Sequence, residues 1–178
     1  MKIPMFDLKF LHLLTQRETA HVILSPEGAF TYIQLRRSIK AARNLLTSNG
    51  VVAGQKVALL GKNSTDYVIT ILTLWQMGAI VVPLNTHWPL HLIGESLVRI
   101  GCSVLIDLND QTVGNSLPNI TSLFISGFSK ESIADIDIAP VKSDIIEAEQ
   151  PASILFTSGS TGFPKAAVHS FANHYYSA

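Results

Sequence analysis

The chain has 178 residues, of which 47% are hydrophobic and 15% charged, so we expect a globular, soluble protein that buries a sizeable core. Lys plus Arg and Asp plus Glu number 13 each, which leaves no net charge to attract nucleic acid or an anionic membrane, so any anion recognition must be local. One cysteine, Cys102, excludes an internal disulfide and suits a small core residue, and the absence of a leader pattern at the start favours the cytoplasm.

The first part of the chain predicts a short helix, a hairpin and a longer helix. Residues 7–16 carry leucines at helical spacing, and residues 21–25 and 29–31 flank a proline–glycine turn. Thr31 can cap the longer helix, whose apolar residues recur every three or four positions before Asn49-Gly50: Leu35, Ile39, Ala42 and Leu46.

The middle of the chain alternates between strand and helix patterns. Apolar runs at 56–61, 80–84 and 104–108 predict strands, and helices are expected to begin near Ser64 or Asp66 and at Pro89. Short connections in this β-α-β-α-β order favour right-handed crossovers. The predicted fold is therefore an α/β fold with a mostly parallel sheet flanked by helices.

Residues 67–93 contain no charged side chain and are long enough to suggest a membrane span. Polar residues interrupt the stretch, and Gly78 separates a helix-like half from the β-branched run at 80–84. We interpret it as a buried helix followed by a strand, and we expect no membrane span.

The next segments are a surface loop at 109–119, a short strand at 123–127 and an acidic connection at 130–150. The carboxylates of the connection lack the spacing of a calcium loop. His87 and His91 are four residues apart, but Pro89 places His87 before the helix and no H-E-x-x-H pattern is present. We therefore expect no metal site in the protein itself.

The most informative stretch runs from Ser153 to His169 and reads Ser-Ile-Leu-Phe-Thr-Ser-Gly-Ser-Thr-Gly-Phe-Pro-Lys-Ala-Ala-Val-His. It predicts a buried strand, a loop rich in glycine and hydroxyl groups, and a helix with Pro164 in its first turn. Glycines can turn N–H groups toward an anion, and a helix N-terminus and Lys165 would add positive charge. The pattern predicts a phosphate chain, that of ATP, as the ligand.

The loop is not a Walker A motif, because that motif has Gly directly before the Lys and Ser or Thr directly after it. Here Pro164 precedes Lys165 and Ala166 follows it. This disfavours a conventional P-loop kinase or ATPase.

The segment from Thr157 to Lys165, Thr-Ser-Gly-Ser-Thr-Gly-Phe-Pro-Lys, resembles the phosphate-loop signature of the adenylate-forming superfamily. That superfamily includes acyl-CoA synthetases, aryl-CoA ligases, luciferases and non-ribosomal peptide adenylation domains. Ala166-Ala-Val-His169 together with His174 and Ser177-Ala178 is similar to 2-succinylbenzoate–CoA ligases of menaquinone biosynthesis. Two positions depart from the general family, which prefers Gly at 166 and commonly has His at 171, where this chain has Phe.

The resemblance implies two chemical steps, which are adenylation of a small carboxylic acid by ATP and transfer of the acyl group to coenzyme A. Magnesium would accompany the triphosphate. The implied phosphate-binding residues are Thr157, Ser158, Gly159, Ser160, Thr161, Gly162 and Lys165. The implied catalytic residues are Lys165 and His174. His169 and His174, five residues apart, are expected on different sides of the predicted helix.

The resemblance covers the chain from about Phe30 onward and implies a partial N-terminal AMP-binding domain over residues 1–178. Its expected parts are a helix and hairpin at 1–30, the alternating sheet at 31–127, the acidic connection at 128–150, and the phosphate-loop segment at 151–178. Members of the superfamily are much longer. We therefore expect an N-terminal fragment that needs the rest of the ligase chain, is inactive alone, and self-associates through exposed apolar surface.

Two other functions share the loop and remain open at this point. One is a non-catalytic module that binds a nucleotide or another anion. The other is an acyl- or aryl-CoA synthetase for a different acid.

Overall fold

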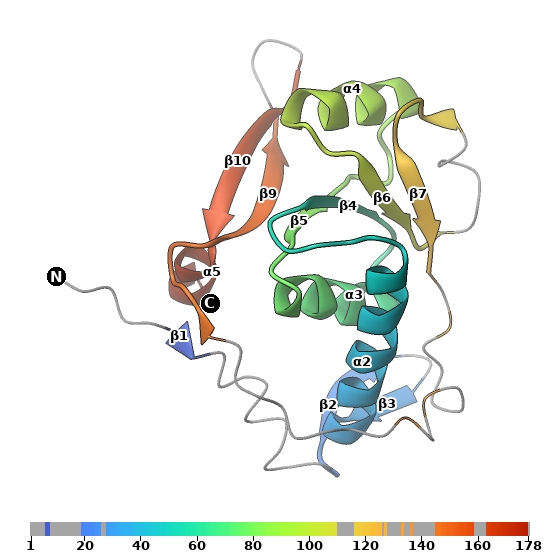
Figure 1. Cartoon of the computed structure of the whole chain (residues 1–178), viewed down its shortest axis with the longest axis vertical. Coiled ribbons are helices and arrows are strands. Elements are labelled where there is room, and N and C mark those ends of the chain that lie inside the picture. Colours follow the sequence, from blue (N-terminus) through green and yellow to red (C-terminus); the bar gives the residue numbers. More distant parts are fainter. Residues whose placement is uncertain are drawn as a thin grey trace, which may run out of the picture.

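The computed structural model describes residues 6–7, 19–25, 28–109, 116–125, 127, 133, 136, 145–158 and 163–177. Its centre is a six-stranded sheet (Figure 1). In spatial order the strands are β10 (Lys165–Ser170), β9 (Pro151–Thr157), β5 (Ile80–Pro83), β4 (Lys56–Leu60), β6 (Val104–Asp107) and β7 (Thr121–Phe124). All neighbours pair in parallel except β9 and β10, which form an antiparallel hairpin. The predicted mostly parallel α/β fold is confirmed.

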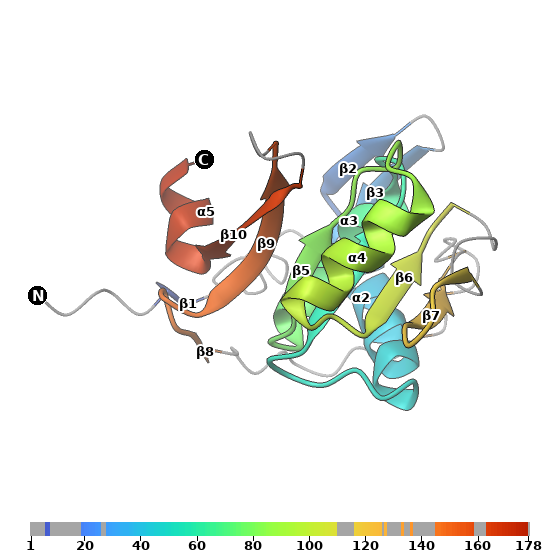
Figure 2. The same ribbon diagram turned by 90° about the horizontal axis from the view of Figure 1, so that it is seen from above.

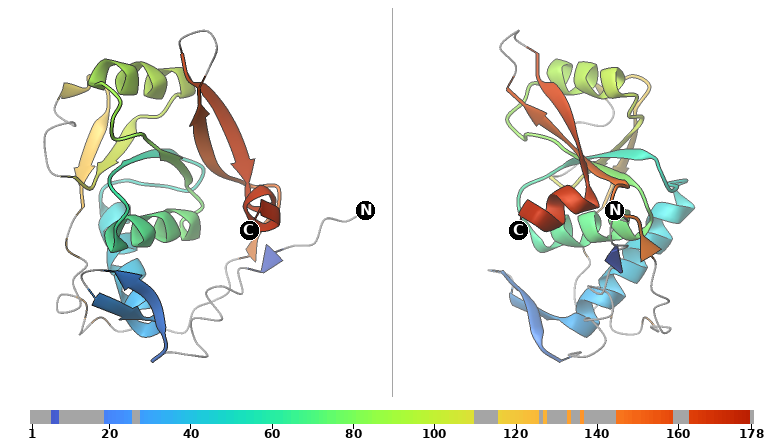
Figure 3. Two further views of the ribbon diagram at one scale, coloured as in Figure 1. Left: turned by 180° about the vertical axis from the view of Figure 1, so that it is seen from behind. Right: turned by 90° about the vertical axis from the view of Figure 1, so that its left-hand side faces the viewer.

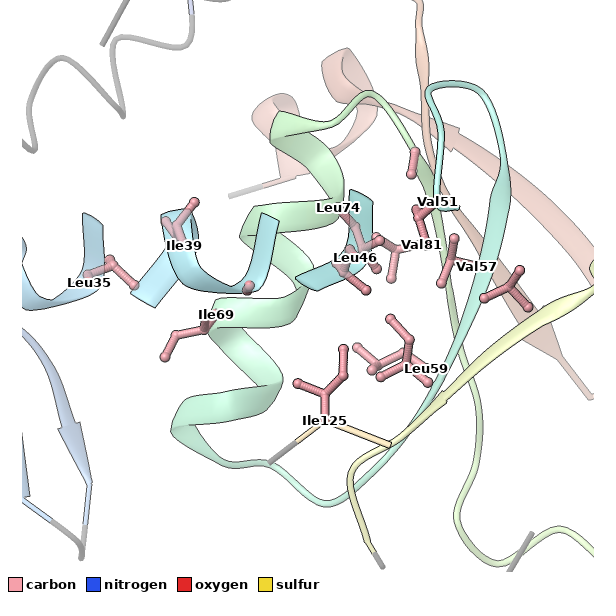
Figure 4. Close-up of a cluster of buried hydrophobic side chains, with 14 of the residues drawn as sticks. Leu35, Ile39, Leu46, Val51, Val57, Leu59, Ile69, Leu74, Val81 and Ile125 are labelled. Atoms are coloured by element: carbon pink, nitrogen blue, oxygen red, sulfur yellow. The ribbon is translucent and has the colours of Figure 1, made fainter. Parts of the chain in front are cut away.

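The central strand β4 supplies both faces of the core, as expected of a continuous apolar run covered on two sides. Val57 and Leu59 pack in one cluster with α2 (Tyr32–Ser48) and α3 (Thr65–Gln76). Ala58 and Leu60 pack in a second cluster with α4 (Leu90–Ile100). Figure 2 shows α4 on one side of the sheet and α2 and α3 on the other, and Figure 4 shows the first cluster.

Capping residues that can be recognised in the sequence set the boundaries of the helices. Thr31 and Gln34 form a reciprocal capping box at the start of α2, and the Ser64 side chain accepts from the Tyr67 N–H at the start of α3. Pro89 precedes α4, and Gly101 ends it with φ of 64°, a left-handed conformation that glycine adopts without strain. These three helices confirm the sequence prediction.

Two small antiparallel pairs accompany the sheet. The predicted hairpin is present as β2 (His21–Ser25) and β3 (Gly28–Thr31), which lies at the far end of the molecule from α4 (Figure 3). The other pair joins β1 (Phe6–Asp7) to β8 (Ile145–Ile146). Of the helix expected at 7–16, only Asp7 is described, and it lies in strand β1. Residues 8–16 lie outside the described residues.

The helix expected directly after the phosphate loop is not formed. Lys165–Ser170 is instead strand β10, and helix α5 (Phe171–Ser177) begins only after it. Pairing with β9 decides the outcome, since Ala166, Ala167 and Val168 stand opposite Phe156, Leu155 and Ile154. Pro164 stands directly before this edge strand, where its lack of a backbone N–H removes no hydrogen bond of the sheet.

Smaller differences concern the outer part of the sheet and the segments after it. Strand β7 covers Thr121–Phe124 rather than 123–127, and most of the loop at 109–119 and of the acidic connection lies outside the described residues. Cys102 is free and buried as predicted, and its Sγ donates to the carbonyl oxygens of Lys56 and Val104.

The uncharged stretch at 67–93 divides between α3, β5 and the start of α4, as interpreted from the sequence. None of the helices in the described ranges has the length and apolar character that crossing a bilayer requires. Among those same residues, His, Cys, Asp and Glu nowhere gather in threes as a metal site.

Candidate functional site

The two ends of the predicted phosphate loop lie at the carboxyl end of β9. Thr157 closes β9 and Lys165 opens β10 directly opposite it, and both residues are exposed. Thr157 Oγ1 donates to the Lys165 carbonyl oxygen across 3.5 Å, so the backbones of the two residues are fixed against each other. Ser158 is exposed beside them, whereas Gly159, Ser160, Thr161 and Gly162 lie outside the described residues.

This location has two consequences for anion binding. The loop follows the carboxyl end of a strand that runs parallel to its neighbour β5, and open α/β sheets bind ligands outside the carboxyl ends of their strands. Because β10 replaces the expected helix, no helix N-terminus stands at Lys165. At the end of the β9–β10 hairpin, the Lys165 ammonium group supplies positive charge, and Thr157 and Ser158 add hydroxyl groups.

A second cluster of polar and aromatic groups lies at the opposite end of the β9–β10 hairpin. Ser153 Oγ and His174 Nε2 are hydrogen-bonded at 2.8 Å, and the Trp75 indole packs on the His174 ring with centroids 5.4 Å apart. Trp75 Nε1 donates to the Ala152 carbonyl oxygen at 2.9 Å, and its ring meets Phe171 edge-on. These contacts hold α5 against β9 and α3.

The expectation that His169 and His174 point to different sides of one helix is wrong. His169 belongs to β10 and His174 to α5, and their ring centroids are 5.8 Å apart. The change of element between them brings the rings together. The sequence contained a signal for that change, because Ser170 and Asn173 cap α5 reciprocally in the manner of a helix start: the Ser170 N–H donates to Asn173 Oδ1, and Ser170 Oγ accepts from the Asn173 N–H.

Ser153 and Trp75 are partners of His174 that were not predicted from the sequence. Ser153 stands in the quoted motif, but its role depends on the register of the hairpin, which places His169 opposite it. Trp75 lies at the end of α3, far away in sequence. Nothing local to these residues indicates that they meet.

The structure does not bring Lys165 and His174 together. Lys165 pairs with Thr157, whereas His174 contacts Ser153 four residues earlier on β9. At about 3.3 Å per residue these two points are ~13 Å apart along the strand. The two predicted catalytic side chains therefore lie at opposite ends of one hairpin and would have to act on different parts of a ligand.

Burial lowers the pKa of His174 below its ordinary value of 6.5, and the charge of the nearby His169 lowers it further. The unfolded chain then binds this proton more readily than the folded one. The stability associated with His174 is complete above pH ~6.5 and declines as the pH falls through that value toward the lower folded pKa. We expect a lower thermal unfolding midpoint at pH about 5.5 than at about 7.5, and a smaller difference in His174→Gln. Equal differences in the two proteins would contradict this assignment.

A family model described as AMP-binding enzyme matches residues 13–178. The hybrid PKS-NRPS synthetase xenE of Xenoacremonium sinensis is 35% identical over 145 residues, which are 79% of this chain and 4% of that protein. The 2-succinylbenzoate–CoA ligase of Listeria monocytogenes serotype 4b (strain F2365) is 30% identical over 166 residues, which are 93% of this chain and 33% of the ligase. The chain thus spans at most a third of the length of these two relatives.

Among solved structures, the N-terminal subdomain of Klebsiella oxytoca NpsA in complex with 3-hydroxybenzoyl-AMSN superposes with a TM-score of 0.74 and 27% identity. The match covers 94% of this chain and 41% of that one. The fold, the loop signature and the extent of the family match agree. The chain belongs to the AMP-binding enzyme family of the adenylate-forming superfamily.

Proposed function

We propose that these residues form the partial N-terminal AMP-binding domain of an ATP-dependent acid–CoA ligase. The observation that carries the proposal is the Thr157–Lys165 segment, whose two described ends are fixed against each other at the carboxyl end of β9 with the Lys165 side chain exposed. Its substrates would be a small carboxylic acid, magnesium-bound ATP and coenzyme A.

The proposed reaction has two steps, which are adenylation of the acid and formation of the thioester. A carboxylate oxygen attacks the α-phosphorus of ATP, an O–P bond forms, and the bond from that phosphorus to the bridging oxygen breaks as pyrophosphate leaves. The thiolate of coenzyme A then attacks the acyl carbon, a C–S bond forms, and AMP leaves with the electrons of the broken C–O bond.

Within this scheme the loop residues 157–162 and Lys165 hold the β- and γ-phosphates. Negative charge develops on the departing pyrophosphate, and the Lys165 ammonium group neutralises it where it develops, which lowers the barrier without reorganisation. His174 lies ~13 Å along β9 from the phosphate end, and we assign it to the acyl side of the site. Its neutral form, favoured by the lowered pKa, can accept a hydrogen bond as well as donate one.

For the acid itself we propose 2-succinylbenzoate. The support is the run Ala166-Ala-Val-His169 with His174, together with the similarity to the Listeria ligase. The similarity to xenE, a hybrid PKS-NRPS synthetase, makes other acids the alternative that an experiment must separate.

The experiment is carboxylate-dependent exchange of labelled pyrophosphate into ATP, catalysed by the complete reading frame that contains these residues. The acids compared are 2-succinylbenzoate, benzoate and a medium-chain fatty acid. Exchange selective for 2-succinylbenzoate supports the ligase and the acid, and exchange with another acid retains the adenylation chemistry only. No exchange with any acid, combined with measurable ATP binding, would favour the non-catalytic module.

The 178-residue chain alone is expected to give no exchange, since it spans 33% of the length of the ligase relative. It is also expected to self-associate. Val168 on the edge strand β10 and Tyr175 and Tyr176 on α5 are 60%, 64% and 71% exposed, which leaves apolar surface on this side of the sheet. Light scattering at increasing protein concentration measures this association.

A further inference from the structure

Both flanks of the predicted phosphate loop rest on the segment that carries α4. On the side before the loop, the ring of Phe156 packs against Trp88, with centroids 5.4 Å apart. On the side after it, the guanidinium carbon of Arg99 lies 4.3 Å from the centroid of the Phe163 ring. Phe156 and Phe163, which flank the loop, therefore both contact α4 or the residues directly before it.

Arg99 is free to act on the loop because the core uses the other faces of α4. Ile93 and Leu97 are buried against the sheet, whereas Arg99 is exposed in the last turn of the helix. Arg99 and Phe163 are part of the wall of one pocket of about 640 Å³ on the outer side of α4, together with Leu90, Val98 and Leu117. The guanidinium group thus covers the Phe163 ring outside the sheet's core.

The connection from Phe163 to Lys165 is short and stiff. Pro164 separates the two residues, and its ring restricts φ to a narrow range. Lys165 is itself held by its pairing with Thr157. A contact that restrains Phe163 therefore also restrains the direction from which the chain enters Lys165.

We propose that Arg99 is a positioning residue for ATP, which acts through the face of Phe163 to hold the lysine end of the phosphate loop in place. The inference rests on the proposed function, because it assigns the loop to ATP. A residue whose backbone is already restrained, as Lys165 is, loses less conformational entropy when it binds the phosphates. Arg99 would therefore contribute to the affinity for ATP and not to the chemical step.

The test measures KM for ATP and kcat separately in the pyrophosphate exchange of the complete reading frame. Arg99→Met removes the charge, and Phe163→Leu removes the ring while keeping an apolar side chain. Each is expected to raise KM for ATP by about two- to five-fold, the range that a cation–π contact at an exposed site supplies, with kcat little changed. Phe163→Trp keeps a ring, with the better face for a cation, and should retain the KM of the unsubstituted protein.

Two controls separate positioning from a structural effect. Arg43→Met removes the same side chain from an exposed position on α2 and should leave KM unchanged. The double substitution Arg99→Met with Phe163→Leu should match the single ones, because both remove one contact. Unchanged KM in either single variant, or multiplied effects in the double variant, would overturn the role of Arg99. Absence of exchange in the unsubstituted protein would instead reject the proposed function, and with it any role of Arg99 toward ATP.

Discussion

Replacing Lys165 by Ala is expected to lower kcat/KM for ATP in the adenylation step by about 10²- to 10³-fold, the loss that follows removal of one preorganised group from a site of developing charge. Lys165 places a positive charge at the loop end of the β9–β10 hairpin, and its side chain is exposed to solvent. The effect should appear in pyrophosphate exchange at saturating acid. Lys165→Arg should recover part of the rate, since it keeps the charge but presents a planar group.

The matched control is Lys62→Ala. Lys62 is an exposed lysine just after the end of β4, at the carboxyl edge of the same sheet. Its removal measures what the loss of one positive charge costs at this edge in general. A similar loss in both variants, or a loss below about ten-fold in Lys165→Ala, would mean that Lys165 does not act on the departing pyrophosphate.

Leu59→Ala is expected to lower the free energy of unfolding by about 3–5 kcal/mol, the cost of deleting a large buried side chain and leaving a cavity. Leu59 is fully buried on the central strand and packs in the cluster with α2 and α3 (Figure 4). Because small domains are stable by only about 5–15 kcal/mol, the loss is a large part of the total. Urea unfolding followed by the fluorescence of Trp75 and Trp88 measures it.

Leu24→Ala is the control for this substitution. Leu24 lies on β2 and is 80% exposed, so the same change of side chain should cost less than about 0.5 kcal/mol. If both variants unfolded at the same urea concentration, the sheet would not form the core as described.

The parallel part of the fold could be predicted because its signals are local. Ser64 and Pro89 stand before α3 and α4, and Gly78 and Gly101 follow them with φ of 71° and 64°. Each of these residues acts on the chain next to it, Ser64 through its side chain and the glycines through their own φ, so its effect does not depend on distant partners. The candidate loop could be proposed from the sequence for the same reason, since its residues are contiguous.

The elements that were missed depend on pairing between segments. Ala166 and Ala167 suit a helix, yet the ladder with β9 makes them part of a strand. The alternation of exposed Ala166 and Val168 with partly buried Ala167 and His169 is a strand pattern, but it is too short to outweigh alanine's preference for helix. Contacts such as Trp75 with His174 and Arg99 with Phe163 exist only once the hairpin and helices have docked.

The place of β9 beside β5 also determines when the candidate site can form during folding. The unit β4–α3–β5 is local in sequence, and so is the β9–β10 hairpin, whereas Val81 of β5 and its partner Ser153 of β9 are far apart along the chain. Closing that long loop costs entropy that only later contacts repay, so we expect the hairpin to dock after the rest of the sheet has condensed. Under the proposed function, a chain that has acquired ATP affinity has therefore completed the slowest step of its folding, and bound nucleotide would hold that last-docked hairpin in place.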